Sequence, residues 1–201
     1  MMLSYCYMVE DYTLYEGIKR ILPGQYLVAD ATSLQVKTYY EIHNDEINIS
    51  LDDAIEEVER LFVRTVQLQA AKNDEYGFNH WSALSAGLDS RMTCWILRRL
   101  GYDNVTAFTY SQVGEFDQIY PGKMASAMKY EWLFNSLDNG LDMFGIDESI
   151  QLADGIIHYS WVSQLSHFLK LVDRAKLGIV HTGVIGDVVP GTFYRHQSTR
   201  K

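Results

Sequence analysis

The sequence lacks the features that mark several specialised classes of protein. It has only two cysteines, Cys6 and Cys94, so neither a disulfide framework nor a cysteine-based metal site is expected. No stretch approaches the roughly 18 consecutive apolar residues of a membrane span. The N-terminal segment has no basic region followed by an apolar run, which a signal peptide needs. These absences predict a cytoplasmic protein with no membrane partner.

Positive charge is also scarce. The chain has 17 lysines and arginines against 26 acidic residues, a formal net charge of -9. Binding a nucleic-acid backbone needs a basic face, so we expect no nucleic-acid partner. An acidic protein can still bind a polyphosphate where backbone N–H groups or Mg²⁺ supply the positive field.

The composition that remains is that of a globular protein. The 201 residues are 47% hydrophobic and 21% charged, which suits one domain of ordinary size or one domain and a fragment. Near the N-terminus, a Pro23-Gly24 turn precedes two apolar runs, 25–29 and 34–40, which predict a β-hairpin. Two strands alone are marginal in water, so this hairpin is expected to pack on something else.

From about His43 onward, predicted helices and strands alternate. Ser50, with Asp53 three residues later, predicts the start of a helix. The later elements are a strand ending at Leu84, helices over 89–100, 116–130 and about 155–176, and strands over 104–110 and 177–183. This alternation predicts the α/β class, with a parallel sheet covered by helices on both faces.

Parallel sheets bind ligands at the carboxyl ends of their strands. One such end opens into Ser85-Ala86-Gly87-Leu88-Asp89-Ser90 and then a helix. Small side chains and a helix N-terminus suit a phosphate, and a carboxylate beside a phosphate implies a bridging Mg²⁺. The loop is neither a Walker loop nor a GxGxxG dinucleotide motif. The competing interpretation is a common strand-to-helix turn in which Asp89 only caps the helix.

Three segments carry a resemblance to a known family. "LSAGLDSR" (84–91) resembles the LSGGLDS loop of asparagine synthetases, which belong to the PP-loop ATP pyrophosphatases. "LYEGIKRILPGQYLVAD" (14–30) resembles the end of that family's glutaminase domain, and "TGVIGDVVPGTF" (182–193) resembles its SGEGxDExFGGY segment. The order and spacing agree along nearly the whole chain.

The resemblance implies a fold and an activity. Residues 1–45 would be the remnant of a class II glutamine amidotransferase domain with its linker, and residues 46–201 a PP-loop synthetase domain. Such a domain binds ATP and Mg²⁺, adenylates a carboxylate (aspartate in this family) and lets ammonia or an amine displace AMP. The family extends past both ends of this sequence, which implies a truncated product or a fragment. We expect no glutamine hydrolysis, because Cys6 is not N-terminal.

The resemblance also implies roles for individual residues. The loop would hold pyrophosphate and Mg²⁺. Two strand ends would border the adenosine. A second carboxylate for the metal would come from a segment late in the chain. The loop residues are Ser85, Ala86, Gly87, Asp89 and Ser90, the nucleotide-lining residues are Leu84, Tyr110, Thr182 and Gly183, and the metal carboxylates are Asp89 and Asp187. Asp154 matches either the family's general base or the start of a helix, and Glu115 and Asp117 are expected to cap a helix.

The sequence departs from the family pattern at several positions, and three alternative functions stay open. Ala86 replaces a glycine, and an alanine at this position needs a negative φ. Arg91 replaces a small residue, and its side chain either binds phosphate or lies along the helix. Val184 and Val188 replace glutamates, which favours a nucleotide-binding module without turnover. The second function is that of a related PP-loop ligase with a different acceptor. The third is that of a subunit that completes its fold on a partner chain or a second copy.

Overall fold

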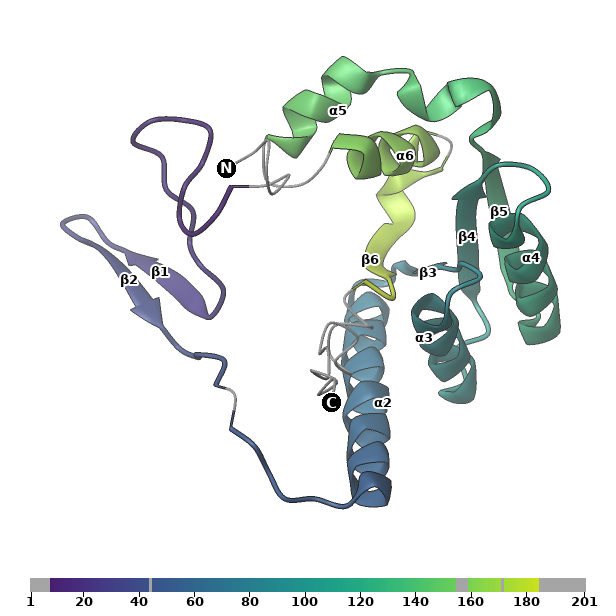
Figure 1. The fold of residues 1–201 in the computed structure, drawn as a ribbon, viewed down its shortest axis with the longest axis horizontal. Coiled ribbons are helices and arrows are strands. Elements are labelled where there is room, and N and C mark those ends of the chain that lie inside the picture. The colour runs from purple at the N-terminus through teal and green to yellow at the C-terminus, as the bar shows by residue number, and fades with distance from the viewer. Residues whose placement is uncertain (1–7, 44, 155–158, 171, 185–201) are drawn as a thin grey trace, which may run out of the picture. The chain divides into compact units, whose positions relative to one another are not determined.

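A computed structural model describes residues 8–43, 45–154, 159–170 and 172–184. Its internal contacts divide the chain into two units. The first contains Met1–Ile49 and Asp142–His167, and the second contains Ser50–Leu141 and Phe168–Lys201. Figure 1 shows the elements of both units.

The first unit contains the predicted hairpin. Strands β1 (Gln25–Ala29) and β2 (Leu34–Thr38) pair antiparallel, with Gln25 opposite Thr38 and Ala29 opposite Leu34. The preceding turn uses Gly24 at φ 77°, where a Cβ would lie 2.0 Å from the carbonyl oxygen of Tyr40. Nearly every residue of the two strands is exposed. The hairpin prediction is therefore confirmed. The same unit also holds α5 (Ile146–Ala153) and most of α6 (Tyr159–Leu169).

The second unit begins with α2 (Leu51–Tyr76), and its predicted cap is confirmed. The Ser50 hydroxyl oxygen accepts a hydrogen bond from the backbone N–H of Asp53 at 3.1 Å. Gly77, in the left-handed conformation, ends the helix.

The sheet of this unit has four parallel strands in the order β5-β4-β3-β6. The strands are β3 (Asn79–Ala83), β4 (Val105–Ser111), β5 (Glu131–Ser136) and β6 (Leu177–His181). Helix α3 (Leu88–Arg99) follows β3, and α4 (Phe116–Met128) follows β4. The α/β class with a parallel sheet flanked by helices is thus present. The sequence did not predict β5.

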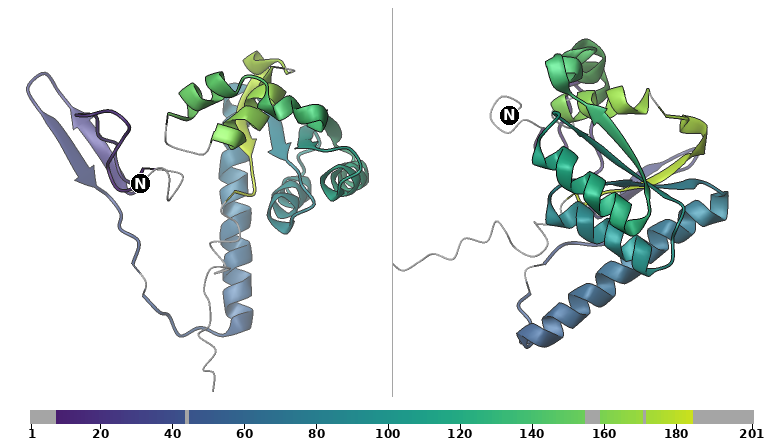
Figure 2. Two further views of the ribbon diagram at one scale, coloured as in Figure 1. Left: turned by 45° about the horizontal axis from the view of Figure 1, so that its top comes forward. Right: turned by 90° about the vertical axis from the view of Figure 1, so that its right-hand side faces the viewer.

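Side chains from the strands belong to two apolar clusters. One cluster joins α2, α3 and α4 to the sheet through residues such as Val66, Leu97 and Ala107. Figures 1 and 2 show these three helices along the sheet, with α2 next to β6 and α4 next to β4 and β5. The second cluster packs Trp81 and Phe108 against Phe168 at the end of α6. The sheet is therefore covered on both faces.

The strand order reverses between β3 and β6. The chain moves from β3 to β4 to β5 in one direction, and it then returns to place β6 on the other side of β3. In open α/β sheets, ligands bind at such a reversal, outside the carboxyl ends of the two strands. The loops after β3 and β6 flank this point.

One predicted helix differs from the structure at its end, and the expected start residue has another role. The helix expected over 155–176 ends earlier, because α6 stops at Leu169 and a separate 3-10 turn, η2 (Arg174–Lys176), precedes β6. Asp154 does not start a helix but ends α5, with φ 45°. In the described parts of the chain, no helix has the length and apolarity to cross a bilayer.

Candidate functional site

The end of β3 is fixed tightly to its neighbour. Leu84, which directly follows β3, is 2% exposed. Its N–H donates to the carbonyl of Phe108 at 2.9 Å, and its carbonyl accepts from the hydroxyl of Thr109 at 2.6 Å. The loop that follows therefore starts from a rigid position.

Two serines join the ends of this loop. The Ser85 N–H donates to Ser90 Oγ at 2.9 Å, and the two hydroxyl oxygens lie 2.8 Å apart. The Ser85 hydroxyl also accepts the N–H of Gly87 at 3.2 Å. The structure thus brings together Ser85, Gly87 and Ser90, which the sequence predicted as phosphate-binding residues.

Ala86 is held from both sides by charged side chains. Its N–H donates to Asp117 Oδ1 at 2.6 Å, and its carbonyl accepts from Arg91 Nη2 at 2.8 Å. Ala86 is not among the non-glycine residues with positive φ, so the condition for replacing glycine here is met. Arg91 folds back onto the loop.

Helix α3 begins at this loop without a side-chain cap. Gly87 is the N-cap residue, with φ -68° and ψ 163°, and makes no side-chain capping bond. Gly87 and Leu88 are exposed, and Asp89 is half-buried in the first turn. Uncapped N–H groups and the positive end of a helix dipole favour an anion at this end.

The loop after β6 meets this first turn. A Cβ built on Gly183 would lie 2.3 Å from the backbone nitrogen of Ser90 and 2.8 Å from Cβ of Asp89. Only a glycine permits so close an approach. The two loops at the strand-order reversal, 98 positions apart from Ser85 to Gly183, therefore form one surface.

The other predicted residues lie in different settings. Tyr110 sits near the end of β4, packs against the Trp81 and Phe108 cluster, and has a pKa raised by burial. Thr182 is exposed directly after β6. Asp154 belongs to the first unit, and Asp187 lies outside the described residues. Roles for these four residues stay predictions.

The loop suits a phosphate better than a metal held by protein alone. The Nε atom of Arg91 is buried and has no hydrogen-bond partner, so a donor remains free beside Ala86. Among the described residues, no three His, Cys, Asp or Glu side chains form a metal-binding group. A magnesium ion here would therefore take Asp89 together with phosphate oxygens and water.

Asp117 has a role that the sequence did not predict. It was expected to cap α4, whereas its carboxylate reaches the loop after β3. The only signal in the sequence is its position near the start of a helix that follows the neighbouring parallel strand. Both loops lie at the same edge of the sheet, so an acid there is able to reach across.

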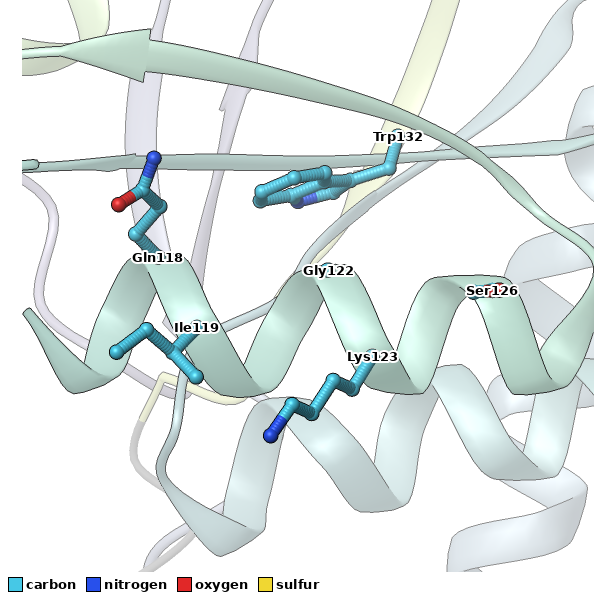
Figure 3. A pocket seen from close by; sticks show the side chains of 6 residues that line it. All are labelled: Gln118, Ile119, Gly122, Lys123, Ser126 and Trp132. Carbon is cyan, nitrogen blue, oxygen red and sulfur yellow. The ribbon is translucent and has the colours of Figure 1, made fainter. Parts of the chain in front are cut away.

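A separate open hollow of about 510 Å³ lies along α4. It is lined by Gln118, Ile119, Gly122, Lys123, Ser126 and Trp132. In Figure 3 the Trp132 ring lies across α4 near Gly122, while the Lys123 side chain points away from it. The lining contains none of the predicted site residues.

The sequence matches no family model and no curated protein. A functional assignment for this chain therefore depends on the short sequence motifs and on the geometry of the site.

Proposed function

We propose that this chain is an ATP-dependent, amide-forming ligase domain of the asparagine synthetase type. The observation that carries the proposal is the meeting of Gly183 with the first turn of α3 at the strand-order reversal. Both segments were predicted as nucleotide-binding from separate motifs. A common strand-to-helix turn would not need the second loop at this place.

The proposed roles follow from the groups present. The uncapped N-terminus of α3 and the hydroxyls of Ser85 and Ser90 would bind the pyrophosphate portion of ATP. Asp89 would bind Mg²⁺, with Asp187 as the proposed second carboxylate. Leu84, Tyr110, Thr182 and Gly183 would border the rest of the nucleotide, and Asp154 is retained as the proposed general base. The PP-loop class and the amidotransferase origin of the hairpin belong to the same proposal.

The reaction is a carboxylate adenylation followed by amide formation. An oxygen of an aspartate-like carboxylate attacks the α-phosphorus of ATP, and the bond to pyrophosphate breaks. Ammonia or an amine then attacks the acyl carbon, loses a proton and releases AMP. Helix N-terminal N–H groups suit this chemistry because they stabilise the negative charge that develops on the leaving pyrophosphate.

One observation favours a second candidate, a nucleotide-binding module without turnover. Val184, which follows Gly183, is 75% exposed, where the family resemblance calls for a glutamate. An exposed apolar side chain at this position supplies no charge for handling a metal or ammonium. ATP binding without pyrophosphate release would select this candidate.

The deciding experiment measures pyrophosphate release from Mg·ATP by the full chain, with aspartate and ammonium each present or omitted. We expect aspartate-dependent release that Asp89→Ala abolishes. Asp45→Ala, an exposed acid in the linker before α2, is the matched control and keeps wild-type release. If the wild type neither binds Mg·ATP nor releases pyrophosphate, the proposal is wrong. If the wild type and Asp89→Ala bind Mg·ATP with equal affinity, the proposed binding of ATP by the loop after β3 is wrong.

A further inference from the structure

We propose that Asp117 is a positioning residue of the phosphate-binding loop, acting with Arg91 to fix the peptide groups on either side of Ala86. This inference builds on the proposed function of the loop. It assigns a role to a carboxylate that belongs to neither the loop nor its helix.

The contact with Asp117 is short and charge-assisted. Its Oδ1 lies 2.6 Å from the Ala86 nitrogen, and the residue is half-buried, second in α4. A hydrogen bond to an ionised carboxylate is about twice as strong as one between neutral groups. The loop after β3 is therefore fastened to the helix after β4, 31 positions further along the chain.

Arg91 holds Ala86 from the opposite side. We call Asp117 and Arg91, together with their two hydrogen bonds to Ala86, the clamp. Its Nη2 donates to the Ala86 carbonyl at 2.8 Å, so one residue is held at its N–H by an acid and at its C=O by a base. Both peptide planes that flank Ala86 are then fixed before any ligand arrives. A loop ordered in advance loses less conformational entropy on binding.

The clamp also determines where a phosphate binds. The N–H groups of Ser85, Ala86 and Gly87 all have acceptors within the protein. A ligand phosphate is thereby directed to the first turn of α3, beside Asp89 and Gly183, instead of to the Ala86 N–H. Asp117 thus contributes through the loop and does not itself touch the ligand.

The test compares three variants of the full chain. Asp117→Ala removes the acceptor, Asp117→Asn keeps an oxygen acceptor without charge, and Glu115→Gln neutralises the exposed neighbouring acid, which makes no capping bond. Calorimetric titration with Mg·ATP and with magnesium pyrophosphate gives the affinities. We expect Asp117→Ala to weaken both by about tenfold or more, with Asp117→Asn intermediate and Glu115→Gln unchanged.

Amide hydrogen exchange of Ala86, followed by NMR without ligand, tests the clamp separately. We expect exchange about tenfold faster in Asp117→Ala than in wild type, and wild-type exchange in Glu115→Gln. Wild-type Ala86 exchange or wild-type affinity in a folded Asp117→Ala protein would overturn the inference. Tighter binding by Asp117→Asn would do the same, since it would mean that the charge opposes the ligand. If the wild type binds neither ligand but the clamp is seen in exchange, the proposed function fails and the clamp stands.

Discussion

Two glycines at the site differ in what a side chain would meet there. Gly87 has an ordinary extended backbone, and a Cβ there would lie 3.2 Å from Ser85 Oγ, a side-chain atom able to shift. A Cβ on Gly183 would instead meet the backbone of Asp89 and Ser90, which shifts less easily than the end of a side chain. The packing of the chain therefore requires a glycine at position 183 but not at position 87, where the proposed phosphate would need the space.

A pair of alanine substitutions separates these two reasons. We expect Gly87→Ala to fold with wild-type stability but to bind Mg·ATP at least about tenfold more weakly, because its methyl group occupies the approach to α3. Gly183→Ala should lower the free energy of unfolding by about 1–3 kcal/mol through overpacking. Urea denaturation and calorimetric titration of both variants check this. Equal stability of the two would contradict the packing at Gly183.

His80 and His181 form a buried pair beneath α2. Both are 0% exposed, and their rings stack with centroids 6.0 Å apart. His80 Nε2 lies 3.0 Å from the Asp74 carboxylate, His181 Nδ1 lies 3.3 Å from the Gln69 amide oxygen, and Tyr102 packs on the His80 ring. Burial, with a smaller contribution from His80, lowers the pKa of His181 to about 4.

This pair predicts a loss of stability in acid. His181 binds a proton near pH 6.5 when unfolded but only near pH 4 when folded, so stability falls as the pH drops from 6.5 toward 4. At pH 5 the expected loss is about 2 kcal/mol relative to pH 7. Urea midpoints at the two pH values measure it. His181→Gln should flatten the dependence, and the exposed His43→Gln should leave it unchanged. A dependence that survives His181→Gln would assign it to other groups.

At the scale of elements, local signals predicted well and long-range ones did not. The hairpin, the Ser50 cap and the helix after Asp89 follow from turn residues, capping and periodicity, which act over a few positions. Strand β5 was missed because Trp132 and Leu133 contact opposite faces of the sheet, which removes the alternation that marks a strand. Without β5, neither the strand order nor its reversal follows from the sequence. The contact between Asp117 and Ala86 was not predicted either, because the two residues lie 31 positions apart in the chain.

Asn73 of α2 holds the outer edge of β6. Its Oδ1 accepts the N–H of Ile179 at 2.7 Å, and its Nδ2 donates to the carbonyl of the same residue at 3.0 Å. Asn73 is 1% exposed, so its side-chain amide takes the place of a neighbouring strand. Gly178 makes room for it, because a Cβ there would lie 2.3 Å from Asn73 Oδ1.

Replacing Asn73 should therefore destabilise the second unit. We expect Asn73→Ala to lower the free energy of unfolding by about 2 kcal/mol or more, because two main-chain groups lose their partner. Gln67→Ala, at an exposed position of the same helix, is the control and should change it by less than about 0.5 kcal/mol. Denaturant unfolding of both variants gives the comparison. Similar values for the two would show that water replaces the Asn73 amide.

At the scale of the whole molecule, the net charge of -9 opposes the binding of free ATP. The site adds Asp89 and Asp117, while Nη2 of Arg91 is engaged with Ala86 and its buried Nε lacks a partner. Removal of Mg²⁺ with EDTA should therefore weaken ATP binding by at least about tenfold. Titrations with and without Mg²⁺ measure this effect, and Asp89→Ala should reduce the difference. Equal affinity in EDTA would mean that backbone N–H groups alone neutralise the phosphates.

The contact between Asn73 and Ile179 also makes the two ends of the sheet unequal. At β6 the main chain of Ile179 is occupied by a side chain, whereas β5 ends the sheet at the other side. If a sheet can accept a new strand at just one of its two edges, it joins one further molecule and then stops. No second open edge remains for another molecule. Without this amide, β6 would also present unpaired main-chain groups, and a sheet that is open at both ends permits repeated addition of strands.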